Sequence, residues 1–177
     1  MTGHKSRLSY TVLVLAACRT SAPAPPPPLE PETRVTLRPR DRPGALTQAD
    51  RDSLVRELEV HRAAWRARHI ADYRIQVAAG CFCPWPSNPA ILEVRGGVAV
   101  ALRDTTGKSM GQPREPWSAY TVEGLFESVA QAARRSDVVD VAYDPQYDYP
   151  AMMRGIGKVG LPDNWFWVKA SRLTPSR

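Results

Sequence analysis

The sequence predicts an α+β fold, a two-layer sandwich in which an antiparallel sheet of about five or six strands carries two helices on one face. Segments with helical periodicity and segments with alternating apolar residues follow one another in the order α-β-β-β-α-β-β-β. The connections between consecutive strands are too short to hold crossover helices, which argues against a doubly wound parallel sheet.

The first helix is predicted to begin after Thr47. Thr47 is followed by Asp50 at the third helical position, which is a variant of the capping box. Apolar, aromatic and histidine side chains then recur at helical spacing, which predicts one stripe of an amphipathic helix that ends near His69. That stripe consists of Leu54, Leu58, His61 and Trp65.

Three strands are predicted next. Residues 73–79 alternate between apolar and polar, as in a half-buried strand. Residues 91–95 and 98–103 flank Gly96-Gly97, and two glycines supply the positive φ angles of a two-residue β-hairpin turn. Residues 104–119 are expected to form a loop, because they contain several glycines and prolines.

The second helix is predicted to be capped by Thr121 and to bury Val122, Leu125, Phe126 and Val129. Three strands follow, at about residues 139–143, 151–156 and 165–171, and Val139, Val141 and Tyr143 share one face of the first of them. The two halves of the chain repeat the same order of elements. No repeat of individual residues links them, so a duplication is only suggested.

The chain starts with a predicted export signal. Lys5 and Arg7 precede an apolar run over residues 8–17, which is much shorter than the roughly 20 residues that span a bilayer. Leu15-Ala16-Ala17-Cys18 resembles the lipobox of bacterial lipoproteins, in which the cysteine is lipidated. The resemblance implies a signal peptide over residues 1–17 and attachment to the membrane through lipid on Cys18.

Residues 18–46 are predicted to form a lipid-anchored, Pro-rich tether, and residues 47–174 a single globular domain. Arg34, Arg38, Arg40 and Arg42 form a mildly basic cluster in the tether, where a solvated linker is favoured over attraction to anionic lipid headgroups. Arg19 follows Cys18, and the resemblance to lipoprotein sorting signals then implies the periplasmic face of the outer membrane in a diderm cell. Elsewhere basic and acidic residues alternate, which argues against a nucleic-acid partner.

Cys81-Phe82-Cys83-Pro84 is the most distinctive motif of the predicted domain. In an extended strand both sulfur atoms face one side, and a disulfide between them needs a bend, which Gly80 and Pro84 favour. A structural disulfide is the favoured interpretation, with free thiols, a redox role and metal binding as alternatives. Two cysteines supply only half the ligands of a structural zinc site, and no metal site is predicted.

Trp165-Phe166-Trp167 is the densest aromatic cluster. In a strand, Trp165 and Trp167 face one way while Phe166 and Val168 face the other, so one pair belongs to the core. Trp165 and Trp167 are binding candidates, because exposed aromatic patches are frequent contact sites. The sequence leaves open whether they are core or contact surface.

The remaining candidate residues favour structural roles. His61 and His69 share a helix face and are expected at the rim of a packed surface, and Asp144 and Asp148 lie in a turn. No phosphate-binding loop, nucleophile elbow or catalytic triad is found, so no catalytic residue and no cofactor are predicted.

Several separated motifs together resemble a bacterial family known as domain of unknown function 6174, over about residues 65–173. They are Tyr73-Arg74, Cys81-Phe82-Cys83-Pro84, Thr121-Val122-Glu123-Gly124-Leu125-Phe126, Val139-Asp140-Val141-Ala142-Tyr143-Asp144-Pro145 and Tyr149-Pro150. Members are typically exported or lipid-anchored, and the resemblance implies no activity or cofactor. Two departures stand out: Asp148 occupies a position where glycine is usual, and the segment after Met153 is rich in glycine.

These features predict a lipid-anchored cell-envelope protein with a non-catalytic binding or structural domain and a possible envelope protein as partner. The alternative is a redox-active or metal-binding protein that uses Cys81 and Cys83. A hydrolase ranks third, because no nucleophile and base are placed together.

Overall fold

The computed structural model describes residues 44–81 and 88–176. The predicted signal peptide, Cys18, most of the tether and Cys83 lie outside these residues. In the part of the chain that is described, no helix is long and apolar enough to cross a membrane.

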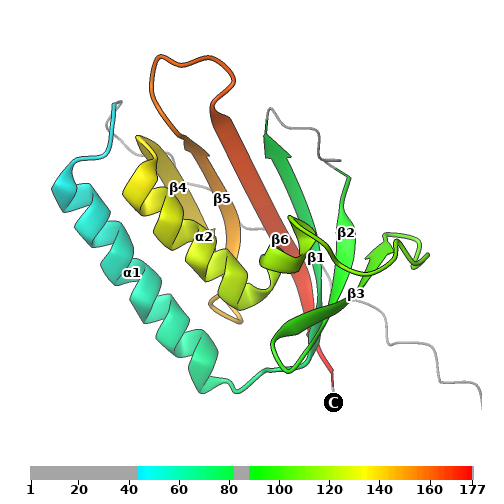
Figure 1. Cartoon of the computed structure of the whole chain (residues 1–177). Helices are drawn as coiled ribbons and strands as arrows, with labels where there is room; N and C mark the ends of the chain where they lie inside the picture. Colours follow the sequence, from blue (N-terminus) through cyan, green and yellow to red (C-terminus); the bar gives the residue numbers. More distant parts are fainter. Residues whose placement is uncertain (1–43, 82–87, 177) are drawn as a thin grey trace, which may run out of the picture.

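The described chain contains two α-helices, a short 3-10 helix and a six-stranded sheet. The elements are α1 (Gln48–Ala67), β1 (Tyr73–Cys81), β2 (Ala90–Arg95), β3 (Val98–Asp104), η1 (Trp117–Tyr120), α2 (Val122–Arg135), β4 (Val138–Tyr143), β5 (Pro150–Ile156) and β6 (Trp165–Pro175). Both helices lie side by side across one face of the sheet (Figure 1). The predicted α+β class and the order α-β-β-β-α-β-β-β are confirmed.

The strand order is β3-β2-β1-β6-β5-β4, and every neighbouring pair is antiparallel. The two halves of the sheet meet at β1 and β6, the first strand of one half and the last strand of the other. A duplication with two-fold symmetry would instead join equivalent strands. The strand order therefore gives no support to the suggested duplication.

Helix α1 begins with the predicted capping box. The backbone N–H of Asp50 donates to the hydroxyl of Thr47, and the Asp50 carboxylate accepts from the backbone N–H of Thr47. The helix ends at Ala67, slightly earlier than predicted, because His69 has a φ of 52° and has left the helical conformation. Leu46, the last residue of the predicted tether, is buried in the core.

Helix α2 is fixed to the centre of the sheet at its N-terminus. The Thr121 hydroxyl accepts from the backbone N–H of Gly124 at 3.2 Å, as predicted for an N-cap. The phenol oxygen of Tyr73, on β1, accepts from the backbone N–H of Val122 at 2.8 Å. Burial raises the pKa of Tyr73 well above its usual range, so the phenol stays neutral.

The predicted hairpin is present, and Gly96 and Gly97 both have positive φ angles in its turn. The segment predicted as a loop contains η1, a 3-10 helix that the sequence analysis missed. Strand β6 continues past the predicted end at residue 171 as far as Pro175 and supplies the long pairing with β1.

Alternation along the strands sorts their side chains onto two faces. Val139, Met153 and Val168 point into the core beneath the helices, together with the partly buried Phe166. Trp165 and Trp167 alternate with these residues and lie on the opposite face. We call that face the open face, since no helix of the described chain covers it.

Candidate functional site

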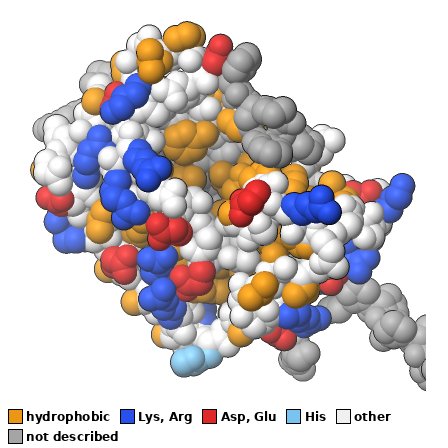
Figure 2. Space-filling view, viewed as in Figure 1, with side chains coloured by type: hydrophobic (Ala, Val, Ile, Leu, Met, Phe, Trp, Pro, Cys, Tyr) orange, Lys and Arg blue, Asp and Glu red, His pale blue; other side chains and the backbone are white. Residues whose placement is uncertain are grey.

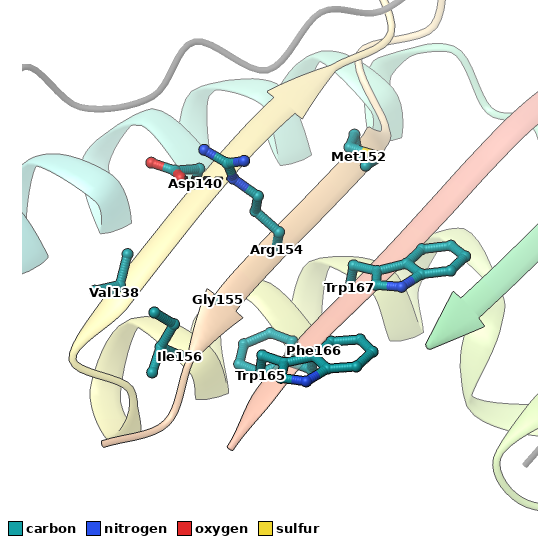
Figure 3. Close-up of a pocket in the computed structure, with 9 residues that line it drawn as sticks. All are labelled: Val138, Asp140, Met152, Arg154, Gly155, Ile156, Trp165, Phe166 and Trp167. Carbon is teal, nitrogen blue, oxygen red and sulfur yellow. Dashed lines mark hydrogen bonds and ion pairs between the residues drawn. The ribbon is translucent and has the colours of Figure 1, made fainter. Parts of the chain in front are cut away.

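A shallow cavity of about 540 Å³ lies on the open face, over β4, β5 and β6 (Figure 3). We call it the aromatic groove. Its lining residues are Val138, Asp140, Met152, Arg154, Gly155, Ile156, Trp165, Phe166 and Trp167. Most of the lining is apolar, which makes the groove suited to a ligand that buries hydrophobic surface.

The antiparallel register brings the groove residues together. Trp165 lies opposite Ile156 and Trp167 lies opposite Arg154, so the two indoles stand beside β5 side chains of the same face. The Trp165 residue is 46% exposed, whereas Trp167 is partly buried. The structure thus places both predicted binding residues on the open face, and their role in binding remains a prediction.

Gly80 allows Trp167 to lie across the neighbouring strand. The two residues are paired in register, and a Cβ added at Gly80 would lie only 2.3 Å from the indole Nε1 of Trp167. Figure 3 shows this indole leaning toward β1. The bend predicted between Gly80 and Pro84 lies mostly outside the described residues and stays a prediction, while the indole gives Gly80 a reason of its own within β1.

Two glycines of the glycine-rich segment, Gly155 and Gly157, make room for side chains that lie on β6 or just before it. A Cβ at Gly155 would lie 2.5 Å from the Phe166 ring, and one at Gly157 would lie 2.4 Å from Oδ1 of Asn164. The sequence analysis noted these glycines as a departure from the family pattern. Their physical role is the close approach of the β5 backbone to bulky side chains.

Asp140 and Arg154 form the polar end of the groove. Nε of Arg154 donates to Oδ2 of Asp140 at 3.0 Å, and the two residues face each other in the register of β4 and β5. The Asp140 residue is only 7% exposed, so the guanidinium supplies the charge partner that a buried carboxylate needs. The sequence analysis missed this pair, because the β4–β5 register was not known from the sequence.

Cys81 is the last residue of β1 and is disulfide-bonded. Its partner lies outside the described residues, so the Cys81–Cys83 pairing stays a prediction. Cys81 is paired in register with Phe166, so its side chain lies on the face beneath the helices, opposite that of Trp167. Among the described residues, no group of three or more histidine, cysteine, aspartate or glutamate side chains could hold a metal ion.

His61 and Asp148 meet in a second cluster, on the side of the helices. The His61 ring stacks on Tyr143 at 3.8 Å between centroids, and its Nδ1 lies 3.1 Å from Oδ1 of Asp148. Nη2 of Arg68 donates to the other carboxylate oxygen at 2.8 Å. These contacts join α1 to the β4–β5 turn, which agrees with a structural role for His61. His69 does not belong to this cluster and lines a separate pocket.

Asp148 also explains why glycine is usual at its position in the family. Its φ is 65°, in the left-handed region that glycine adopts without strain. Asp144 begins the turn, and its Oδ1 accepts from the backbone N–H groups of Gln146 and Tyr147 at 2.9 and 2.8 Å. The two carboxylates therefore stabilise the turn, as the sequence indicated.

Comparison with known proteins agrees with the resemblance found in the motifs. A family model described as a family of unknown function (DUF6174) matches residues 57–154, which is more than half of the chain. No curated protein and no solved structure gives a significant match.

Proposed function

Since the chain belongs to the DUF6174 family, a family of unknown function, we propose its role from its own residues. We propose that it is a lipid-anchored cell-envelope protein whose domain binds an envelope partner through the aromatic groove. The observation that carries this proposal is the groove itself, an apolar concavity on a sheet face that no described helix covers.

The residues of the groove support a binding role. Trp165 is half exposed although a tryptophan gains free energy when it is buried, and Ile156 beside it is also exposed. Exposed aromatic residues next to aliphatic ones are typical of contact surfaces between proteins. The groove is open rather than enclosed, which suits the protruding apolar side chains of a partner protein better than a small molecule.

A photo-crosslinking experiment tests the binding role. Trp165 is replaced by p-benzoylphenylalanine in the protein expressed in its bacterial envelope. In a control, the replaced residue is Val98, an apolar residue beside the β2–β3 turn that is even more exposed than Trp165. We expect a discrete adduct from position 165 that is lost when Ile156→Glu is added. Equal labelling from positions 165 and 98 would contradict the proposal.

The anchoring part rests on Leu15-Ala16-Ala17-Cys18 and on the Pro-rich segment that follows. Mass spectrometry of the protein purified from bacterial membranes tests it. We expect a chain that begins at Cys18 with acyl chains attached, since stable anchoring needs more than one chain. A chain that still begins at Met1 would contradict it.

A redox role of the cysteines is the second candidate, and the observation that favours it is the disulfide on Cys81 at the end of β1. A redox disulfide must be reducible in the native fold. Mild dithiothreitol followed by thiol alkylation and mass measurement tests this role. Resistance of the disulfide until the protein unfolds would overturn it and leave a structural disulfide.

A further inference from the structure

Exposed apolar side chains gather at the connection between β5 and β6. Ile156, Val159, Leu161 and Trp165 belong to the large hydrophobic residues of the described chain that stay exposed, and Val159 and Leu161 are 57% and 60% exposed. We call these four residues the apolar tip. Figure 2 shows hydrophobic side chains at this upper end of the molecule.

The backbone of the apolar tip is held by hydrogen bonds. The N–H of Gly157 donates to the carbonyl of Asn164 at 2.8 Å and closes the connection at its base. The N–H of Val159 donates to Oδ2 of Asp137 at 2.9 Å, and Nζ of Lys158 donates to Oδ1 of the same carboxylate at 3.1 Å. Val159 and Leu161 are therefore presented to solvent by an ordered backbone.

The described chain begins at the same end of the molecule. The N–H of Leu46 donates to the carbonyl of Asp137 at 2.6 Å, and the N–H of Asp137 donates to the carbonyls of Ile156 and Gly157. Asp137 thus contacts both the start of the domain and the base of the apolar tip. Figure 1 shows the start of α1 and the β5–β6 connection at one end, with the C-terminus at the other.

We infer that the apolar tip contacts the lipid bilayer to which the chain is tethered. This inference rests on the lipid anchoring proposed above, because a tether that joins the domain beside the tip makes the tip end the one nearest the anchor. Tryptophan and aliphatic side chains are the residues that enter the interfacial region of a bilayer. The tether adds a high local concentration to a contact that the apolar side chains make on their own.

The charges near the apolar tip define the kind of contact. Lys158 is the one cation within residues 157–164, and it is paired with Asp137. Burial of apolar surface then drives the contact, and attraction to anionic headgroups contributes little. We therefore expect similar binding to zwitterionic and anionic vesicles and a weak dependence on salt.

The test uses the chain from residue 18 with Cys18→Ser, which keeps every described residue but carries no lipid. Its partition into phosphatidylcholine vesicles with brominated acyl chains is measured by sedimentation and by quenching of tryptophan fluorescence. The double variant Val159→Ser and Leu161→Ser should reduce the partition about tenfold, since each side chain loses its transfer into the bilayer. The variant Leu161→Trp should increase it.

The matched control is Val60→Ser with Val98→Ser, two side chains of similar exposure away from the apolar tip. Equal partition of the tip variant and this control would overturn the inference. So would a dimer in analytical ultracentrifugation that Leu161→Ser abolishes, because a second copy would then cover the tip. Trp165 belongs to both surfaces, so the two proposals are separated by what each measurement detects. A protein adduct from position 165 supports the groove, and tryptophan quenching that is lost with Val159→Ser and Leu161→Ser supports the contact of the apolar tip with lipid.

Discussion

The two faces of one sheet differ sharply in this protein. On the face beneath the helices, Ile75 and Val139 have no exposed surface, and Tyr73 binds the first N–H of α2. On the open face, the same sheet presents Trp165, Ile156 and Arg154 to solvent. Alternation along a strand supplies apolar side chains to both faces, but only one of them is needed for the core. The need for a stable core therefore does not explain why the open face carries apolar surface.

The largest contrast is expected between a core residue and a groove residue. Phe126→Ala should lower the free energy of unfolding by about 3–5 kcal/mol, because it opens a cavity beneath the helices. Trp165→Ser should change it by less than about 0.5 kcal/mol, because the indole is half exposed. Urea denaturation of both variants measures the difference. Similar losses would show that the open face contributes to the core.

Gly80→Ala should destabilise the protein by about 1–3 kcal/mol, because the new methyl group overlaps the indole of Trp167. The second substitution Trp167→Ala should remove most of the added cost, and a double-mutant cycle on the free energy of unfolding measures this coupling. Additive effects of the two substitutions would contradict the close approach of indole and strand.

Tyr73→Phe should cost about 1 kcal/mol or slightly more, because it leaves the backbone N–H of Val122 without its acceptor. Hydrogen exchange should then become faster at the start of α2 and stay unchanged in α1. Tyr120→Phe is the control. The Tyr120 ring packs on Trp117, and its hydroxyl makes no hydrogen bond to the described chain. An equal loss in both variants would assign the effect to packing.

The smallest effect concerns the turn held by Asp148. Burial would raise the pKa of this carboxyl, but hydrogen bonds from Arg68 and His61 and their charges outweigh it and lower the pKa. The Asp148 carboxylate therefore stabilises the fold at pH values above the pKa that this carboxyl has in the unfolded chain. The contribution is lost as the pH falls through the lower pKa of the folded state.

Asp148→Asn should remove that part of the pH dependence and cost no more than about 1 kcal/mol at neutral pH. Asp148→Gly should cost less than Asp148→Asn, because glycine adopts the positive φ without strain. Thermal melting from pH 7 to pH 3 measures both effects. A pH profile of Asp148→Asn that matches the unchanged protein would contradict the assignment.

Most of the fold could be predicted from local signals. The Thr47 capping box, the Gly96-Gly97 turn and the stripe from Val122 to Val129 each depend on residues close together in the chain, and all three are confirmed. The central pairing of β1 with β6 joins residues that are distant in the sequence, so periodicity gave no signal for it. The 3-10 helix at Trp117 was missed for another reason, since flanking prolines and glycines resemble a loop.

The candidate site was predicted only in part. Alternation placed Trp165 and Trp167 on one side of a strand, but it did not tell which side the helices cover. Asp140 and Arg154 were missed because their contact depends on strand register. Gly80 carries a second signal that was not used, since a glycine within a strand also marks the close approach of a large side chain.

The strand order also has a consequence for the time at which the domain can form. The hydrogen bonds at the middle of the sheet require β6, which is the last of the described strands to be synthesised. Until residues 165–175 are available, β1–β3 and β4–β5 are two hairpin-like pieces with no shared ladder. Such long-range pairing makes folding slow. The nascent chain therefore cannot complete the middle of its sheet until β6 has left the ribosome.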